Sequence, residues 1–304
     1  MRLSVLDQVP ITEHTPAREA ATSGLRLAVA AEKLGYHRIW FAEHHRSESF
    51  AGTAPEMMTA LALERTTDIR VGTGGILLPL YPAAKVAEVM GLLTDVHGDR
   101  VDTGVGRAAL HDPDYAEKIT ALARTFGRRH GLVSPEPPGR LWVLGAGGST
   151  APSAGEAGAG YVHGHFFVPR GGETATAAYR AAADAHGHAS HTTLAVRVVT
   201  AESPERARAL AEAMVLWRVR KDLGYDGPIP SIDTTARYHW TEAEQTRAKA
   251  RATAIISGTP DRVYAELTTL AEAHGAAEIM VNTLTSDPDD RLTSYRLLAE
   301  RFRS

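Results

Sequence analysis

Near-continuous apolar runs alternate with amphipathic stretches along the first third of the chain. Residues 3–6 and 37–42 are apolar enough to be buried strands of a parallel sheet. Between them, apolar residues recur at helical spacing, and Thr15 and Gly35 are suited to begin and end the helix. Residues 82–97 repeat the helical pattern. Strands that alternate with helices predict βα units and a parallel α/β architecture.

Three further elements complete this part of the chain. Thr53 and Glu56 have the spacing of a capping box, which predicts a helix from there to about residue 66. Residues 69–77 are expected to form a third strand, although Gly72, Gly74 and Gly75 fall within it. Glycine weakens a strand unless backbone or ligand must approach closely, so this strand is a candidate for a binding site. Residues 101–107 form the fourth predicted strand.

Four more apolar runs bring the number of predicted strands to eight. They are residues 141–144, 161–167, 193–199 and 278–283. Eight parallel strands favour a (β/α)8 TIM barrel over an open sheet. Helical patterns over 204–223 and 241–256 fall between the last two strands, so that connection holds the largest insertion. We expect residues 1–304 to form a single domain of this α/β class.

Composition excludes several kinds of chemistry and partner. The chain has 304 residues, a formal net charge of −3 and no Cys, so disulfides and thiolate chemistry are excluded. No block of like charge indicates nucleic acid or an anionic membrane as a partner. We expect a cytoplasmic protein, because there is no signal-peptide pattern and no apolar run of membrane-spanning length. The 14 histidines lack metal-ligand spacing, so no metal site is predicted.

Polar residues follow the predicted strands where a barrel places its active site. Glu43 and His44 come after residues 37–42, and Arg107 ends the fourth strand. An arginine in this place could hold a phosphate or a carboxylate through a charge-assisted contact. Each residue taken singly has an ordinary alternative, since a Glu-His pair can simply open a loop and an isolated arginine can form a salt bridge on the barrel rim.

A glycine-rich turn follows the strand at 141–144 and precedes a predicted helix. Its residues are Gly145, Ala146, Gly147, Gly148, Ser149 and Thr150. Backbone N–H groups in such a turn, together with a helix start, can bind an anion. The turn is not a nucleotide P-loop because the lysine is absent, and it does not match Gly-x-Gly-x-x-Gly cleanly. His163 and His165 flank Gly164 at another strand end, where a packing role is an equally good interpretation.

Motifs near both ends of the chain resemble those of bacterial luciferase and the luciferase-like flavin monooxygenases. The N-terminal motifs are WFAEHH (40–45), VGTGGILLP (71–79, with Pro82 and Glu88 after it) and GDRVDTGVGR (98–107). The C-terminal motifs are SGTP (257–260), EIMV (278–281) and RLTSY (291–295). The N-terminal motifs agree in order and spacing as well as in residues, and the resemblance extends over nearly the whole chain.

The resemblance implies a two-component flavin-dependent monooxygenase. Family members are (β/α)8 barrels, usually homodimers, that take reduced FMN from a separate reductase and react it with O2 to give a C4a-peroxyflavin. The peroxyflavin oxygenates a small or medium organic substrate by Baeyer–Villiger oxidation or by hydroxylation, and the sequence identifies neither the substrate nor the branch. The Ala- and Arg-rich composition suggests a setting in secondary metabolism.

The resemblance also assigns roles to residues. His44 matches an active-site histidine proposed to transfer a proton, with an ordinary pKa close to neutrality, and Glu43 is the acidic residue beside it. Arg107 matches an arginine that holds the flavin phosphate or ring edge, and Gly74-Gly75 falls where the family has a non-proline cis peptide beneath the isoalloxazine. The residues assigned to the cofactor are Gly74, Gly75, Arg107, Gly145, Ala146, Gly147, Gly148, Ser149 and His165, the last from a His-Phe pair near the flavin.

Two alternatives stay open. One reason is that segment 108–141 is shorter than in most relatives, where it carries a helix and loop that often cover the flavin. The short segment allows a non-catalytic subunit. A deazaflavin-dependent dehydrogenase on the same barrel is disfavoured, because Glu43-His44-His45 looks more like the FMN-using branch. A non-catalytic flavin-binding or partner subunit is disfavoured as well, because a subunit without chemistry has little need of both His44 and Arg107.

Overall fold

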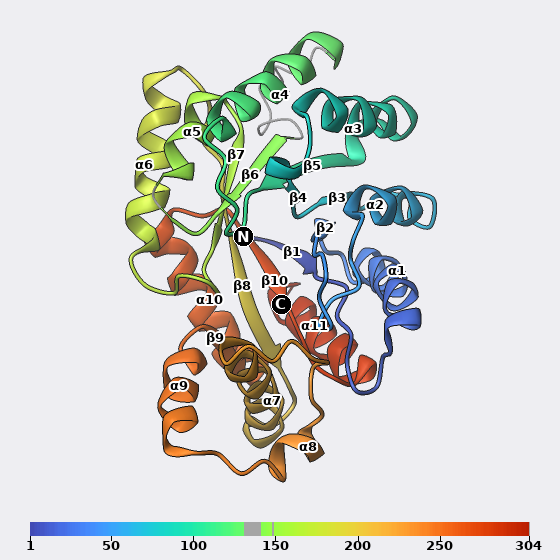
Figure 1. Ribbon diagram of the computed structural model, residues 1–304, viewed down its shortest axis with the longest axis vertical. Coiled ribbons are helices and arrows are strands. Elements are labelled where there is room, and N and C mark those ends of the chain that lie inside the picture. The colour runs from blue at the N-terminus through green and yellow to red at the C-terminus, as the bar shows by residue number, and fades with distance from the viewer. Residues whose placement is uncertain (131–140, 148, 304) are drawn as a thin grey trace.

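Parallel strands form a closed barrel at the centre of the structure, and helices surround it (Figure 1). The computed structural model describes residues 1–130, 141–147 and 149–303. Around the barrel the strands follow the order β1-β2-β3-β5-β6-β7-β8-β10, and β10 pairs with both β8 and β1, which closes the ring of eight. These strands are β1 (Arg2–Asp7), β2 (Arg38–Phe41), β3 (Arg70–Thr73), β5 (Val101–Gly106), β6 (Leu141–Gly145), β7 (Gly160–Gly164), β8 (Thr192–Thr200) and β10 (Glu278–Asn282). The predicted (β/α)8 class is confirmed.

Helices cover the outside of the barrel, and a group of them projects from one side. The covering helices are α1 (Ala17–Lys33), α2 (Pro55–Leu63), α3 (Ala83–His97), α4 (Tyr115–His130), α5 (Thr150–Glu156), α6 (Gly172–Ala185), α10 (Pro260–His274) and α11 (Pro288–Arg303), with 3-10 turns η1 (Leu78–Leu80) and η2 (Gly98–Arg100). Helices α7 (Pro204–Asp222), α8 (Ile232–Ala236) and α9 (Glu242–Ala252) gather at the lower end of Figure 1. All three lie between β8 and β10, where the largest insertion is predicted.

The structure contains two short strands that the apolar pattern does not resolve. The strand expected over 69–77 is interrupted, and its last part is the separate strand β4 (Ile76–Leu77), which pairs with β5. The helix expected over 241–256 ends at Ala252, and β9 (Ile255–Gly258) follows it beside the second half of β8. The helix prediction was wrong there because β-branched Ile255 and Ile256 favour extended backbone.

Helix starts also differ from the predicted caps. The Thr53–Glu56 capping box is wrong: α2 has Ala54 at its N-cap and no side-chain cap. Pro55 explains this, because a proline at the first helical position has no N–H to satisfy and keeps the preceding residue out of the helical region. Pro16 is likewise the N-cap of α1 in place of Thr15.

The barrel lumen is charged near the N-terminal ends of its strands. Asp102, which is fully buried, accepts hydrogen bonds from Arg38 at 2.8 Å and from Arg70 at 2.5 Å. The indole N–H of Trp40 donates to the same carboxylate at 3.0 Å. Arg38 also pairs with Glu278 at 2.8 Å. Burial by itself would raise the pKa of Asp102, but the adjacent guanidinium groups of Arg38 and Arg70 hold that pKa below its usual value.

Further along the lumen the side chains become apolar and then polar again. The apolar layer consists of Leu6, Trp40, Ala42, Trp142, Val162, Ala195 and Met280. Beyond it lie Gln8, Arg197 and Asn282, which are joined by hydrogen bonds from Arg197 to both amide oxygens at 3.1 Å. Layers of inward-facing side chains are the usual filling of this barrel. The polar layer is at the C-terminal ends of the strands, where function is expected.

Replacement of Arg38 by methionine tests how much the charged layer contributes to the stability of the fold. The substitution leaves two buried carboxylates without their shared cation, so we expect Arg38→Met to lower the free energy of unfolding by about 3–5 kcal/mol in urea titrations. Arg262→Met is the matched control, because Arg262 pairs with Glu266 on the surface, and its loss should stay below about 1 kcal/mol. Equal losses in the two variants would contradict this account.

Candidate active site

A cavity of about 520 Å³ opens at the C-terminal ends of the barrel strands. Its lining comes from residues at or just after the ends of most strands, and it includes eight of the eleven residues to which the resemblance assigns a catalytic or cofactor-binding role. These are Glu43, His44, Gly74, Gly75, Arg107, Gly145, Ala146 and Gly147. Residues scattered over more than 100 positions of the chain therefore meet at one site, as the barrel topology predicts.

Of the other three expected residues, two lie outside the lining and one falls outside the described residues. Ser149 is outside the lining but accepts a hydrogen bond from Arg107 at 3.2 Å, so it stands beside the cavity. Gly148 lies outside the described residues. The structure does not bring His165 to the cavity, because β7 ends at Gly164 and the His165 side chain is buried away from it. Phe166, the next residue, lines the cavity instead.

Arg107 and the glycine-rich turn form one corner of the cavity. The guanidinium Nη2 of Arg107, just after β5, donates to the hydroxyl of Ser149, the N-cap residue of α5. Gly147 has no heavy atom within 4 Å of where a Cβ would stand, so its backbone faces open space. A cation, a hydroxyl and open glycine backbone in one corner fit a phosphate group.

Gly74 and Gly75 form a flat part of the wall. The peptide bond between them is cis, as the resemblance leads us to expect. A Cβ on Gly74 would lie 2.6 Å from a methyl carbon of Leu6, and one on Gly75 would lie 2.8 Å from the carbonyl oxygen of Gly104. Neither position has room for a side chain, so backbone alone borders the cavity here.

His44 stands in the wall beside Gln8 and Phe50. Its ring lies 4.3 Å from the Phe50 ring, and its Nε2 is 3.2 Å from the amide nitrogen of Gln8. The Gln8 amide oxygen is engaged by Arg197, which fixes the amide group with its NH2 toward His44. Nε2 of His44 therefore accepts, and the proton of the neutral ring is on Nδ1. That Nδ1 is buried and has no hydrogen-bond partner among the described residues.

The environment of His44 makes it a neutral imidazole at pH 7. Burial, reinforced by the nearby charge of Lys221, lowers the pKa of His44 to about 4. This corrects the expectation of a pKa close to neutrality, which holds for a solvated histidine. The shift follows from the Phe50 contact and the cationic surroundings, neither of which is visible in the local sequence.

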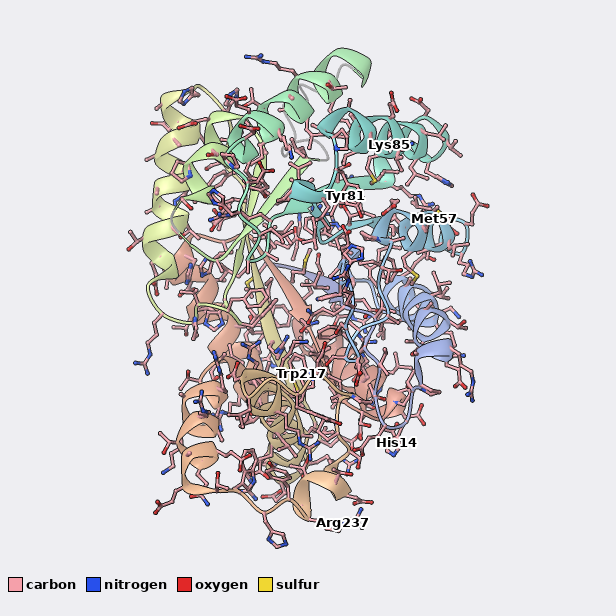
Figure 2. All side chains as sticks on the ribbon, viewed as in Figure 1. His14, Met57, Tyr81, Lys85, Trp217 and Arg237 are labelled. Atoms are coloured by element: carbon pink, nitrogen blue, oxygen red, sulfur yellow. The ribbon has the colours of Figure 1, made fainter. Side chains whose placement is uncertain are left out.

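Glu43 holds the chain around the cis peptide in place. One carboxylate oxygen accepts hydrogen bonds from the His45 ring at 2.5 Å and the Tyr81 hydroxyl at 2.6 Å. The other oxygen accepts the backbone N–H of Leu77 at 2.7 Å. Burial and the Glu43 carboxylate raise the pKa of Tyr81 above its usual value. Figure 2 labels Tyr81 beside the strands. With three donors on the carboxylate, Glu43 is bound into the wall.

Two polar residues escape the sequence analysis, namely Gln8 in the cavity lining and Arg197 directly behind it. Gln8 directly follows β1 and lines the cavity, so the rule that selects Glu43 and His44 would have found it. Arg197 lies inside β8, where every residue is buried. A charged residue in the middle of an apolar strand is itself a signal, because a buried charge needs a reason.

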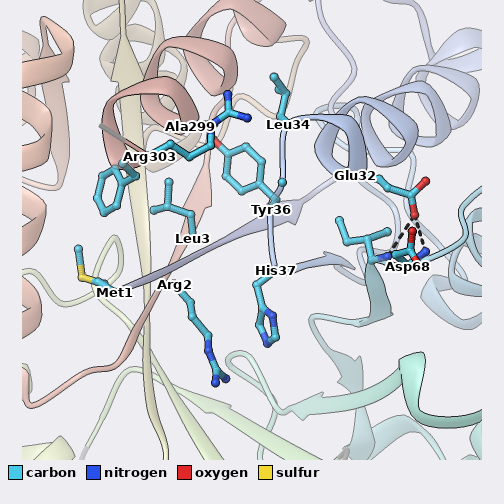
Figure 3. Close-up of a pocket in the computed structure, with 13 residues that line it drawn as sticks. Met1, Arg2, Leu3, Glu32, Leu34, Tyr36, His37, Asp68, Ala299 and Arg303 are labelled. Carbon is cyan, nitrogen blue, oxygen red and sulfur yellow. Dashed lines mark hydrogen bonds between the residues drawn. The ribbon is translucent and has the colours of Figure 1, made fainter.

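A second cavity, of about 530 Å³, lies at the opposite end of the barrel (Figure 3). It is lined by the start of β1, by Tyr36 and His37 before β2, and by Arg303 near the end of α11. Glu32, which also lines it, accepts the backbone N–H groups of Asp68 and Ile69. Barrel enzymes carry their chemistry at the C-terminal strand ends, so we assign the reaction to the first cavity.

Comparisons with known proteins identify the family of this chain. The luciferase-like monooxygenase family matches residues 1–115 and 107–277 of the chain. N-acetyl-S-alkylcysteine monooxygenase of Bacillus subtilis is 31% identical, with 99% of this chain and 98% of the relative covered. Apo-MsnO8, a solved structure, is 33% identical with a TM-score of 0.81, covering 99% of this chain and 98% of the other.

A more distant structure shows the fold alone. It is the oxygenating constituent of 3,6-diketocamphane monooxygenase from Pseudomonas putida, a type II Baeyer–Villiger enzyme in complex with FMN, with 18% identity, a TM-score of 0.70, and 99% and 98% of the two chains covered. Together the matches show that the chain belongs to the luciferase-like monooxygenase family and is an oxidoreductase of the monooxygenase class. Among its described residues, no helix is long and apolar enough to cross a membrane.

The pKa of His44 is directly measurable. With 13C-labelled histidine, the ring resonance that disappears in His44→Asn should not titrate between about pH 8 and 5.5 and should have its midpoint at about 4. The same ring in urea-unfolded protein should titrate at about 6.5. Because the unfolded chain then takes up the proton at higher pH than the folded one, acidification across this interval lowers stability. A folded-state midpoint near 6.5 would refute the neutral assignment.

Proposed function

We propose that this protein is an FMN-dependent, two-component monooxygenase that uses reduced FMN and O2 to oxygenate a small or medium organic substrate. The observation that carries the proposal is one cavity bordered by the phosphate corner at Arg107, the bare Gly74-Gly75 backbone and the buried His44 ring. The apolar wall, to which Leu6 and Leu144 contribute, suits the organic substrate.

The described residues fit FMN. Arg107 and Ser149, with the backbone of residues 145–147, would hold the phosphate. Gly74-Gly75 presents no side chain, so the flat isoalloxazine would lie against backbone there. Reduced FMN, when bound, supplies the electrons that activate O2. Glu43 acts as a positioning residue, because its carboxylate fixes Leu77 and Tyr81 next to this backbone.

His44 contributes a proton held at a defined atom. Its Nε2 accepts from Gln8, so the ring proton is on Nδ1, which has no acceptor among the described residues. A neutral imidazole in a buried site can stabilise developing negative charge by hydrogen bonding without a cationic ring. We assign His44 this role, in place of an imidazolium that gives up its proton.

The family supports the partners and leaves the substrate open. A Bacillus subtilis relative is named for oxygenation of N-acetyl-S-alkylcysteine, which makes thioethers a reasonable class to test first. We also propose a separate flavin reductase, a homodimer and a cytoplasmic location, all supported by the resemblance. A deazaflavin-dependent dehydrogenase would share the barrel, so both cofactors belong in the binding assay.

Arg107→Ala tests the phosphate corner. Loss of a charge-assisted contact should raise the dissociation constant of reduced FMN, titrated anaerobically, by about tenfold or more. Arg26→Ala is the control, because Arg26 is exposed on α1 outside the barrel, and it should leave the constant unchanged. An unaltered constant in Arg107→Ala would refute the assigned role. Tighter binding of reduced deazaflavin by the wild type would move the assignment to hydride transfer.

His44→Ala separates chemistry from cofactor binding. The variant should bind reduced FMN nearly as well as the wild type while oxygenating thioether and aldehyde test substrates at least about tenfold more slowly. His186→Ala, at an exposed site on the outer surface, is the control for general effects of histidine removal. Turnover of His44→Ala equal to that of the control would remove His44 from the mechanism.

A further inference from the structure

Arg197 is a buried cation just behind the cavity lining, where it contacts the lining residues Gln8 and Phe166. It is 6% exposed and lies in the middle of β8. Its guanidinium carbon is 4.9 Å from the centre of the Phe166 ring and 5.2 Å from that of the Trp217 ring. Trp217 lies on α7 where that helix approaches the barrel (Figure 2). The planar guanidinium is thus held between two aromatic side chains.

The hydrogen-bond partners of Arg197 are neutral. Nε donates to the amide oxygen of Asn282 and Nη2 to that of Gln8, both at 3.1 Å. Among the described residues, the other two buried arginines both have a carboxylate partner. Arg38 pairs with acidic groups within the charged layer, and Arg291 pairs with Asp7 at 2.8 Å. No salt bridge within 4.0 Å joins Arg197 to any described carboxylate.

The lack of a counter-charge for Arg197 is energetically unfavourable unless a bound ligand supplies one. Burial, together with the nearby charge of Arg218, lowers the pKa of Arg197 to about 9, so the side chain still carries its charge at neutral pH. A buried charge without a counter-charge is strongly unfavourable, which is why buried arginines are usually paired. The aromatic and amide contacts hold the guanidinium in place but supply no negative charge.

The free edge of the guanidinium suits a carboxylate. Arginine has five N–H donors, and two of the five are used by Asn282 and Gln8. Nη1 and the remaining hydrogen of Nη2 form the end of the fork, and Nη1 has no partner among the described residues. Two parallel donors of this kind match the two oxygens of a carboxylate.

Arg197 is linked to the cavity and to His44 through Gln8. Gln8 and Phe166 both contact Arg197 and both line the cavity. Ala195, two positions before Arg197 on β8, also lines the cavity. The amide oxygen of Gln8 accepts a hydrogen bond from Arg197, and the amide nitrogen of Gln8 faces His44. An anion at Arg197 would therefore place the rest of its molecule beside His44. The phosphate corner belongs to other strands, at Arg107.

We propose that Arg197 binds a carboxylate of the substrate, so that this protein oxygenates organic acids. The proposal rests on the proposed function in one respect, namely that this cavity is where the substrate is oxygenated. Arg197 makes the direct contact with the substrate, and Gln8 is a positioning residue that joins the carboxylate site to His44.

The test compares an acid with its neutral isostere, without flavin. N-acetyl-S-benzylcysteine and its carboxamide are titrated calorimetrically into the flavin-free full chain. The wild type should bind the acid at least about tenfold more tightly than the amide. Arg197→Gln should bind the two equally. Arg218→Gln is the control for the general positive field, because Arg218 is paired with Asp222, and it should retain the preference.

Each other outcome overturns the proposal. Equal affinity of the wild type for acid and amide, or no binding of the acid, shows that Arg197 takes no carboxylate, and this result requires no variant to fold. A preference that survives in Arg197→Gln assigns it to another group. If Arg197→Gln no longer binds reduced FMN but still prefers the acid to the amide, the guanidinium contributes to flavin binding and not to substrate binding. The affinity of the wild type for reduced FMN is measured separately. If the wild type does not bind reduced FMN, the proposed monooxygenase function fails, but the comparison of acid and amide still tests the carboxylate site.

Discussion

The ion pairs of Arg38 with Asp102 and Glu278 hold the barrel together from within. Asp102 belongs to β5 and Glu278 to β10, the strand that closes the ring against both β1 and β8. Charges from strands far apart in sequence therefore neutralise one another in the lumen, and the chain must be correctly wound for any of them to be satisfied. Such a network penalises every arrangement that leaves one member buried alone.

The three layers of the lumen have different roles: the charged and apolar layers stabilise the barrel, and the polar layer is available for ligand binding. The cations and carboxylates of the charged layer neutralise one another, and the apolar layer separates them from the polar layer. The polar layer differs, because Arg197 has only amide partners among the described residues and His44 keeps a buried donor without an acceptor. These unmet requirements lie next to the cavity, where a cofactor and a substrate can meet them. We interpret them as the places left for ligands.

Sequence reasoning recovered what depends on local pattern and on strand ends. Apolar runs and βα alternation predicted the barrel, and the position after each strand predicted Glu43, His44 and Arg107 in one site. The strand β9 was missed because two isoleucines after a helical pattern carry too short a signal. His165 does not line the cavity, because β7 ends at Gly164, three residues before the predicted end at residue 167, and successive residues of a strand face opposite sides. Arg197 and the low pKa of His44 depend on contacts with distant residues, which no local pattern contains.

The central claim is that this cavity binds reduced FMN and is the place where it reacts with oxygen. Rapid mixing of the protein, loaded anaerobically with reduced FMN, with oxygenated buffer under an absorbance detector tests it most directly. The account predicts an oxygen-dependent species that persists well beyond the reoxidation time of free reduced FMN before oxidised FMN appears. Reoxidation at the rate of the free flavin, with no such species, would contradict it.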